Sequence, residues 1–441
     1  MEDNLKYGKV FLCIALISLA IGLIGGVLGS LTYIFPHFLH QYYGFSLLRP
    51  LHVSYAFFWI ILAAIGSVYV GLSSLTNKKP IAWIAFTQIS LWVIALIGIG
   101  YDYLHGNFGG REYWEFNPKW AIFILLSWFL FLINFFHLAK NIQKWPVYVW
   151  MWMTGIIFFI FTFTENYLWV IPYFRENFIT DMTIQWKVAG SLVGSLNQLI
   201  YGVAFYLMDK LNQHNDYKVG SSKTAFFMYF LGLFNLMFNW GHHIYSLPTE
   251  PYIRYVAYAV SMTEWIVFLK IFFDWKKSTQ TVRKYYSFFP YRFLMASDIW
   301  VFINVLQALT MSIPILNRYT HGTHVTVAHS MGTTIGINTM ILFASVFMTF
   351  TRPEQFSKKT KKYLNFVFWG IQISLFGLFL SLNIAGYLRG FWQLSSHQSP
   401  FAVMMNELRP IFISFSISGT LLLVGFYLLL FKLLQLSLRK K

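Results

Sequence analysis

A histidine and a methionine stand two residues apart in the segment His329-Ser330-Met331. Side chains two residues apart on an α-helix point about 200° apart, so these two would face opposite sides of one helix. Both residue types serve as axial ligands of heme iron. One helix could therefore stand between two hemes and hold one on each side. A buried histidine beside a methionine that fills a packing gap explains the same pair equally well.

A second pair of metal-ligating side chains is adjacent in sequence, in Gly241-His242-His243. Adjacent residues on an α-helix diverge by about 100°, so both imidazoles reach one metal only if it sits over the end of the helix. Glu264 follows in a mostly apolar run, where a buried carboxylate needs a metal, a proton or a cation beside it. A metal near the two histidines or a proton-relay role would suit Glu264, and a neutral, hydrogen-bonded carboxyl is the plainer alternative.

The elements that must position these side chains are predicted to be membrane-spanning helices. Of the 441 residues, 57% are hydrophobic and only 11% are charged, against about 25% charged in soluble domains. Twelve runs are long enough to cross about 30 Å of hydrocarbon at about 1.5 Å per residue. Because the connections are short, we expect residues 1–441 to form a single all-α membrane domain surrounded by lipid. The predicted spans are Val10–Tyr33, Leu51–Leu75, Ile81–Leu104, Trp120–Leu138, Val147–Ile171, Val188–Met208, Ala225–Tyr245, Tyr255–Phe273, Phe293–Ile315, Val325–Phe350, Leu364–Tyr387 and Ile411–Leu434.

Basic residues predict how these spans are oriented. They concentrate at both ends of the chain and in alternate loops, as in the run 358–362, and are sparse in the loops between. Loops rich in lysine and arginine stay in the cytoplasm, so both termini are predicted to be cytoplasmic. The formal net charge of +17 is then a signal of topology and not of nucleic-acid binding.

This orientation gives the histidines a depth in the membrane. Ionisable residues at membrane depth are rare and usually functional. Six histidines are predicted to lie in the outer third of the membrane or in an outer loop: His52, His242, His243, His321, His324 and His329.

The helices and the order of these histidines resemble subunit I of the heme–copper oxidase superfamily. The closer resemblance is to the large, catalytic subunit of bacterial cytochrome-c-type nitric oxide reductase. Leu48-Arg49-Pro50-Leu51-His52 is similar to the segment with an axial ligand of the low-spin heme b. Gly241-His242-His243-Ile244-Tyr245 is similar to the segment with two ligands of the non-heme iron. The segment from Thr320 to His329 is similar to the one that carries the proximal ligand of the high-spin heme b3.

Two further segments carry the resemblance. Glu264 matches an active-site glutamate of the family's eighth helix, beside the non-heme iron. Gly110-Arg111-Glu112-Tyr113-Trp114-Glu115 looks like an outer loop whose first glutamate, here Glu112, helps to bind calcium. The resemblance implies an enzyme of the bacterial cytoplasmic (inner) membrane. It would take electrons from a cytochrome c subunit or a soluble cytochrome c and reduce NO to N2O, with protons drawn from the outer side.

The sequence departs from this family pattern at one heme ligand. Met331 stands where the family has the second histidine ligand of the low-spin heme. Ligation by His52 and Met331 is chemically sound, and methionine ligation raises the potential of a heme. We therefore expect a working heme with a more positive potential.

The other departures fall on the sixth predicted span. Gly190 aligns with the third histidine ligand of the non-heme iron, and Gly194 and Gln198 align with two glutamates. Loss of one imidazole should weaken metal binding, and a neutral amide cannot release a proton at physiological pH. Lys187 adds a charge near the outer end of this span, where a long basic side chain commonly extends to the membrane surface.

Two functions of different classes therefore remain open. One is an enzyme that reduces NO, with a relative of nitric oxide dismutase as a variant, because such proteins also alter the ligands of the second metal. The other is a non-catalytic membrane heme protein for electron transfer or gas sensing. Transport is less favoured, because matched Gly/Pro-interrupted helices are not evident. Oxygen reduction is less favoured, because no tyrosine in the sixth or seventh span stands beside a histidine at the helix-turn spacing that matches the oxidase cross-link.

Overall fold

The computed structural model describes residues 3–38, 43–211, 218–282, 288–352 and 355–438. For Asn239, Glu264 and residues 267–268 and 271–282 it describes only the backbone. These described parts are helical and contain no β-strand. Backbone groups find no partner in lipid, so an apolar chain that crosses a membrane satisfies them within helices. The predicted all-helical class is thus confirmed.

Ten helices of the described chain are long and apolar enough to cross a membrane. The remaining two predicted spans are the seventh and eighth. The seventh forms α8 (Lys223–Phe238) and the 3₁₀ helix η4 (Asn239–Ile244), and the eighth lies in α9 (Pro251–Val282). Twelve spans and the orientation of the termini stay predictions. The ten helices are Asp3–Leu31, Phe45–Thr76, Ala82–Leu104, Lys119–Ala139, Val147–Val170, Phe178–Leu211, Phe289–Ser312, His324–Phe350, Lys358–Leu394 and Arg409–Leu438.

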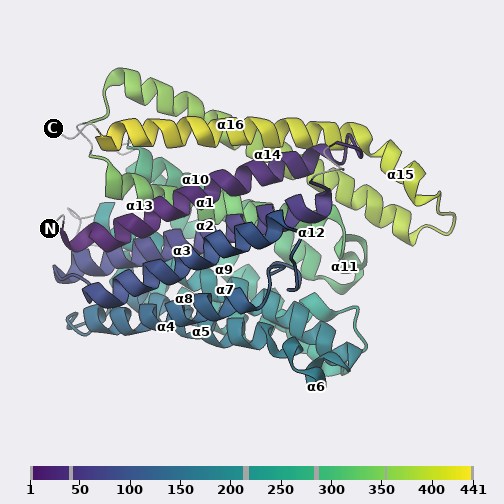
Figure 1. The fold of residues 1–441 in the computed structure, drawn as a ribbon, viewed down its shortest axis with the longest axis horizontal. Helices are drawn as coiled ribbons and strands as arrows, with labels where there is room; N and C mark the ends of the chain where they lie inside the picture. The colour runs from purple at the N-terminus through teal and green to yellow at the C-terminus, as the bar shows by residue number, and fades with distance from the viewer. Residues whose placement is uncertain (1–2, 39–42, 212–217, 283–287, 353–354, 439–441) are drawn as a thin grey trace. The chain divides into compact units, whose positions relative to one another are not determined.

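Contacts divide the chain into two compact units. Unit 1 contains the chain up to Ala15 and Phe57–Val267. Its helices include η1 (Asp3–Leu5), the start of α1 (Lys6–Leu31), most of α2 (Phe45–Thr76), α3 (Ala82–Leu104), α4 (Lys119–Ala139), α5 (Val147–Asn166), η2 (Leu168–Val170), α6 (Pro172–Arg175), α7 (Phe178–Leu211), η3 (Val219–Ser221), α8, η4 and part of α9. In Figure 1, α3, α4 and α5 lie along one another, and α7 packs against α5.

Close packing of α5 and α7 depends on large residues set against small ones. The Trp152 ring of α5 is fully buried, and its edge approaches Gly71 of α2 and Gly202 of α7. A Cβ atom added at Gly202 would lie 2.7 Å from the Trp152 ring. Small residues let membrane helices approach closely, so these glycines bring α7 into its place in unit 1.

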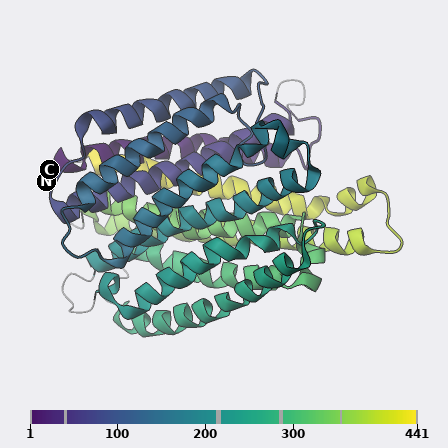
Figure 2. The ribbon, with the colours of Figure 1, turned by 90° about the horizontal axis from the view of Figure 1, so that it is seen from below.

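Unit 2 contains Leu16–Ala56 and Phe268–Lys441. Its long helices α14 (Lys358–Leu394) and α16 (Arg409–Leu438) pack against each other. They are joined through the short α15 (Phe401–Glu407), as the yellow-green end of the ribbon shows in Figure 2. The elements that follow α9 in this unit are α10 (Phe289–Ser312), α11 (Pro314–Thr320), α12 (His324–Met331), the π-helix η5 (Gly332–Thr339), α13 (Met340–Phe350), α14 (Lys358–Leu394), α15 (Phe401–Glu407) and α16 (Arg409–Leu438).

The span that contains His329 is not a uniform α-helix. Thr323 is the N-cap residue of α12, and its side chain accepts a hydrogen bond from the backbone N–H of Val325. The helix then widens into the π-helix η5 directly after Met331. Gly332 and Gly336 of η5 lie so close to α10 that an added Cβ atom would meet Asn304 at 2.3 Å and Trp300 at 2.5 Å. Short π-helical segments of this kind are frequent at functional sites.

Candidate functional site

In unit 2, the ring of His52 is held in one orientation by the backbone of α1. Its Nδ1 lies 2.7 Å from the carbonyl oxygen of Gly22. A carbonyl can only accept, so Nδ1 carries the hydrogen and donates it. The lone pair of the neutral ring then lies on Nε2, which is the arrangement of a histidine that ligates a metal through Nε2.

Glycines of α1 make room for this ring. A Cβ atom added at Gly26 would lie 2.7 Å from Nδ1 and 2.8 Å from Cε1 of His52, and one at Gly25 would lie 3.2 Å from the His52 backbone nitrogen. At Gly29, one turn further on, the nearest atom would be 3.7 Å away, an ordinary contact distance. Gly22, Gly25, Gly26 and Gly29 recur at intervals of three and four residues, a spacing in the sequence that indicates a closely packed partner helix.

His329 and Met331 lie on α12, which is α-helical through both residues. The prediction that their side chains leave opposite sides of one helix therefore agrees with the backbone. Asn304 of α10 fixes the turn that follows, because it donates to the hydroxyl of Thr333, and Thr333 donates to the backbone carbonyl of His329, at 2.6 and 3.1 Å. The backbone of Asn304 lies beside the His329 ring, but no described group makes a well-formed hydrogen bond to His329 Nδ1.

The two other histidines of this segment have different surroundings. His324 is buried, and its ring packs against the rings of Tyr33 and Phe412, with centroids 6.0 and 5.2 Å away. His321 lies between the spans, and burial lowers the pKa of its ring below the usual range. His324 is therefore part of an aromatic cluster in unit 2, and His321 favours its neutral form.

In unit 1, the rings of His242 and His243 converge. They lie on η4, where we had expected the end of an α-helix, and their ring centroids are 4.2 Å apart. The hydroxyl of Ser261 on α9 lies 3.5 Å from Nδ1 of His242. Glu264 lies one turn further along α9, and its side chain is outside the described part of the structure. The two imidazoles thus lie against each other, and their binding of a metal stays a prediction.

Gly190 lies directly against this pair. A Cβ atom added there would be 2.7 Å from Cδ2 and 2.8 Å from Nε2 of the His243 ring. The alignment therefore identified a backbone position that borders the histidine pair, although it supplies no ligand. On the same helix, an added Cβ at Gly194 would meet Leu236 at 3.0 Å, and Gln198 is buried. Among the described residues, no group of three or more His, Cys, Asp and Glu side chains could hold a metal ion.

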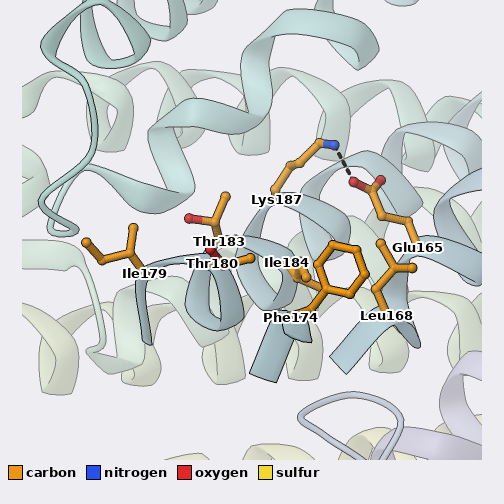
Figure 3. Close-up of a pocket in the computed structure, with 8 residues that line it drawn as sticks. All are labelled: Glu165, Leu168, Phe174, Ile179, Thr180, Thr183, Ile184 and Lys187. Atoms are coloured by element: carbon orange, nitrogen blue, oxygen red, sulfur yellow. Dashed lines mark hydrogen bonds and ion pairs between the residues drawn. The ribbon is translucent and has the colours of Figure 1, made fainter. Parts of the chain in front are cut away.

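Lys187 does not simply extend to the membrane surface. Its ammonium group pairs with the Glu165 carboxylate of α5 and lies 5.6 Å from the centre of the Trp240 ring. The pair lines a pocket of about 290 Å³, which Figure 3 shows with both side chains turned toward each other. Glu165 was missed in the sequence, although a carboxylate in the last turn of an apolar span is itself a signal.

The loop that carries Glu112 is tied to the start of α7. Arg111 forms an ion pair with Asp181 at 2.7 Å, and the Gln185 side chain donates to the Glu112 backbone carbonyl at 3.2 Å. Tyr113 has a φ of 73°, which marks a tight turn next to Glu112. The loop is thus ordered by α7, and calcium binding at Glu112 stays a prediction.

Comparison with known proteins gives the family. Residues 6–421 match the family model described as cytochrome c and quinol oxidase polypeptide I. The chain belongs to this family. It is 22% identical over 414 residues to cytochrome c oxidase subunit 1 of Rhodobacter capsulatus, covering 86% of this chain and 75% of that protein. It is 21% identical over 426 residues to the bacteroid cytochrome c oxidase subunit 1 homolog of Bradyrhizobium diazoefficiens, covering 88% and 74%.

The oxidase subunit I fold is also found among solved structures. A heme–copper terminal oxidase dimer, described in a study of its catalytic mechanism, has a chain that matches with a TM-score of 0.73. The match covers 100% of this chain and 85% of that one, at 14% identity. The protein is thus a multi-span membrane protein of a bacterial respiratory oxidase family, whose members are oxidoreductases that bind hemes and a further metal.

The described residues fit a heme better than they fit a second metal. His52 fits a heme ligand, because its Nδ1 hydrogen is already taken and its Nε2 is left to coordinate iron. The second metal fits poorly, because the described residues gather two imidazoles and the helix that should supply a third has a glycine there. Structural and catalytic metal sites commonly have at least three protein ligands.

Proposed function

We propose that this subunit carries two hemes and acts in an oxidoreductase of the nitric oxide reductase type. It takes electrons from a cytochrome c, as a subunit or as a soluble donor, and reduces NO to N2O. His52 and Met331 hold the low-spin heme b, and His329 holds the high-spin heme b3. Residues 1–441 act as one subunit I domain in the bacterial cytoplasmic membrane, with both termini in the cytoplasm.

The orientation of the His52 ring is the observation that carries this proposal. The hydrogen bond from Nδ1 to the Gly22 carbonyl keeps Nε2 deprotonated and fixes the ring in place. A ligand that is already oriented loses little entropy when it coordinates. When bound, the hemes supply the redox-active iron and the place where a diatomic gas binds.

The positions of His329 and Met331 on α12 support the proposal that each residue ligates a different heme. His329 and Met331 leave opposite sides of the helix, so each can serve a different heme. Asn304 and Thr333 position the turn below His329 through their hydrogen bonds. Met331 would offer its heme a thioether ligand, which would raise the potential and favour uptake of an electron from the donor.

Among the residues whose side chains the structure describes, only His242 and His243 are gathered for a second metal. His242, His243 and Glu264 are its proposed ligands, and iron suits imidazole and carboxylate. The glycine at position 190 favours a second candidate function. In that function the protein is a membrane heme protein that transfers electrons or binds a gas without N–N bond formation. A dismutase-like reaction is the variant of the first candidate.

One set of measurements on the purified protein separates these functions. Heme, iron and copper are counted per chain, and NO consumption is followed with and without a reduced electron donor. Two hemes with donor-dependent NO loss support the reductase, whether or not a third metal is present. NO loss without a donor supports the dismutase variant. Two hemes with no NO loss support the non-catalytic function, and a chain without heme contradicts the proposal.

A further inference from the structure

We propose that Glu165 and Lys187 form a proton-exchange pair that serves His242 and His243, the histidine pair that lies against Gly190 of α7. Glu165 takes protons from water in the adjoining pocket, and Lys187 holds the carboxylate in place. The inference rests on the proposed function, because reduction of a gas at this end of the protein consumes protons.

The pocket provides the water contact that such a pair needs. It has a volume of about 290 Å³, and one water occupies about 30 Å³ in the liquid, so several waters fit. The Thr180 and Thr183 side chains line it together with the ion pair, and Figure 3 shows them on the same stretch of α7 as Lys187. Apolar side chains, such as Phe174, form the rest of its wall.

The pair is also connected to the histidines. Lys187 precedes Gly190 by three residues on α7, so the two share one face of the helix. Gly190 borders the His243 ring, and the Lys187 ammonium lies over Trp240, which belongs to the same 3₁₀ helix as His243. Lys187 is thus linked to the histidine pair in two ways, through Gly190 on its own helix and through Trp240 on η4.

The sequence of α7 leaves few other groups for proton transfer. Between Lys187 and Asp209 the helix contains no carboxylate, amine or imidazole. The Gln198 amide cannot take up or release a proton at physiological pH. Glu165, on the neighbouring helix α5, supplies a carboxylate that pairs with Lys187.

Stability alone is a weak reason for the pair. The Lys187 and Glu165 side chains are 31% and 29% exposed, and ion pairs that solvent reaches contribute little to stability. The same exposure allows exchange with water. In the proposed step the Glu165 carboxylate takes a proton from a pocket water, which regains one from bulk water. Glu165 then passes the proton toward a neutral imidazole of the histidine pair and returns to the carboxylate form, and no electron moves between these groups. The arriving proton balances the charge of an electron taken up by the hemes.

Proton uptake during heme reduction tests the inference without any need for NO turnover. The intact protein is placed in lipid vesicles with Lys187 facing outward and a pH dye outside, and the hemes are reduced by a membrane-permeant donor. Four proteins are compared: the parent, Glu165→Gln, Glu165→Asp and Lys187→Arg. Asp keeps a carboxylate, and Arg keeps the charge and the ion pair without exchanging protons.

We expect Glu165→Gln to slow proton uptake from the outside at least tenfold, and Glu165→Asp and Lys187→Arg to stay within about threefold of the parent. Heme content and the rate of heme reduction should not change in any variant, which separates proton exchange from a purely structural role. Uptake by Glu165→Gln within twofold of the parent, or no uptake from the outside by the parent, overturns the inference. NO consumption, measured separately, decides the proposed function, which can fail while this inference stands.

Discussion

At the residue scale, the backbone carbonyl of Gly22 fixes the orientation of the His52 ring. His52 donates to the Gly22 carbonyl, and Gly26 leaves the space in which the ring lies. This explains why glycines, which have no ligating side chain, would matter to the proposed heme site. A small change in α1 should therefore act on heme binding through His52.

We predict that Gly26→Ala lowers the content of low-spin heme severalfold. The added methyl group would lie 2.7 Å from His52 Nδ1 and would push the ring away from the Gly22 carbonyl. The heme-to-protein ratio and the visible spectrum of the reduced protein measure the effect. Gly29→Ala is the matched control, because its methyl group meets only Leu48 at 3.7 Å and should leave heme content unchanged. Equal heme loss in both variants would contradict this account of His52.

At the element scale, the Trp152 ring of α5 packs against both α2 and α7 in unit 1. Trp152 is fully buried between glycines of α2 and α7, and α7 in turn carries Lys187 and Gly190. Removal of a buried tryptophan loses its buried surface and leaves a cavity. The position of α7 should depend on this packing, and so should the Glu165–Lys187 ion pair and the contact between Gly190 and His243.

We predict that Trp152→Ala lowers the free energy of unfolding by about 3–5 kcal/mol, the range for buried aromatic residues. Trp150→Ala serves as its control, since Trp150 lies two residues away on the same helix and is 39% exposed. It should cost less than about 1 kcal/mol. Denaturation of the two variants in the same detergent gives both values, and a similar loss at both positions would show that Trp152 does not organise the unit.

The elements also show how far the sequence could be read. Hydropathy located α3 and α4 to within a few residues, because lipid imposes helix on any long apolar run. It placed the start of α2 six residues late, since Phe45–Pro50 includes a charged residue and a proline. The π-helix η5 was not predictable, because it arises where Gly332 and Gly336 meet residues of another helix.

Some features of the candidate site can likewise be read from the sequence, and others depend on how the helices pack. Adjacent histidines and the residue types at positions 329 and 331 are properties of the sequence itself. Gly190 was identified through a family resemblance, and its contact with His243 supports that alignment. The Glu165–Lys187 pair joins residues 22 positions apart on different helices, so only the packing of α5 and α7 reveals it.

At the scale of the whole molecule, orientation links the site to one side of the membrane. The basic residues predict that the C-terminus is cytoplasmic. A fluorescent protein fused to the C-terminus should therefore fluoresce in cells, and alkaline phosphatase fused there should be inactive. The opposite result would move the histidine pair and the Glu165 pocket to the cytoplasmic side and change the source of their protons.

The central claim is that one heme lies between His52 and Met331. Near-infrared magnetic circular dichroism of the oxidised protein tests it directly, because it distinguishes methionine–histidine from bis-histidine ligation. The account predicts a methionine–histidine signal in the parent. Met331→His should convert it to a bis-histidine signal and lower the heme potential, by part of the roughly 0.8 V range that axial ligands span. A parent that shows only bis-histidine low-spin heme would contradict the claim.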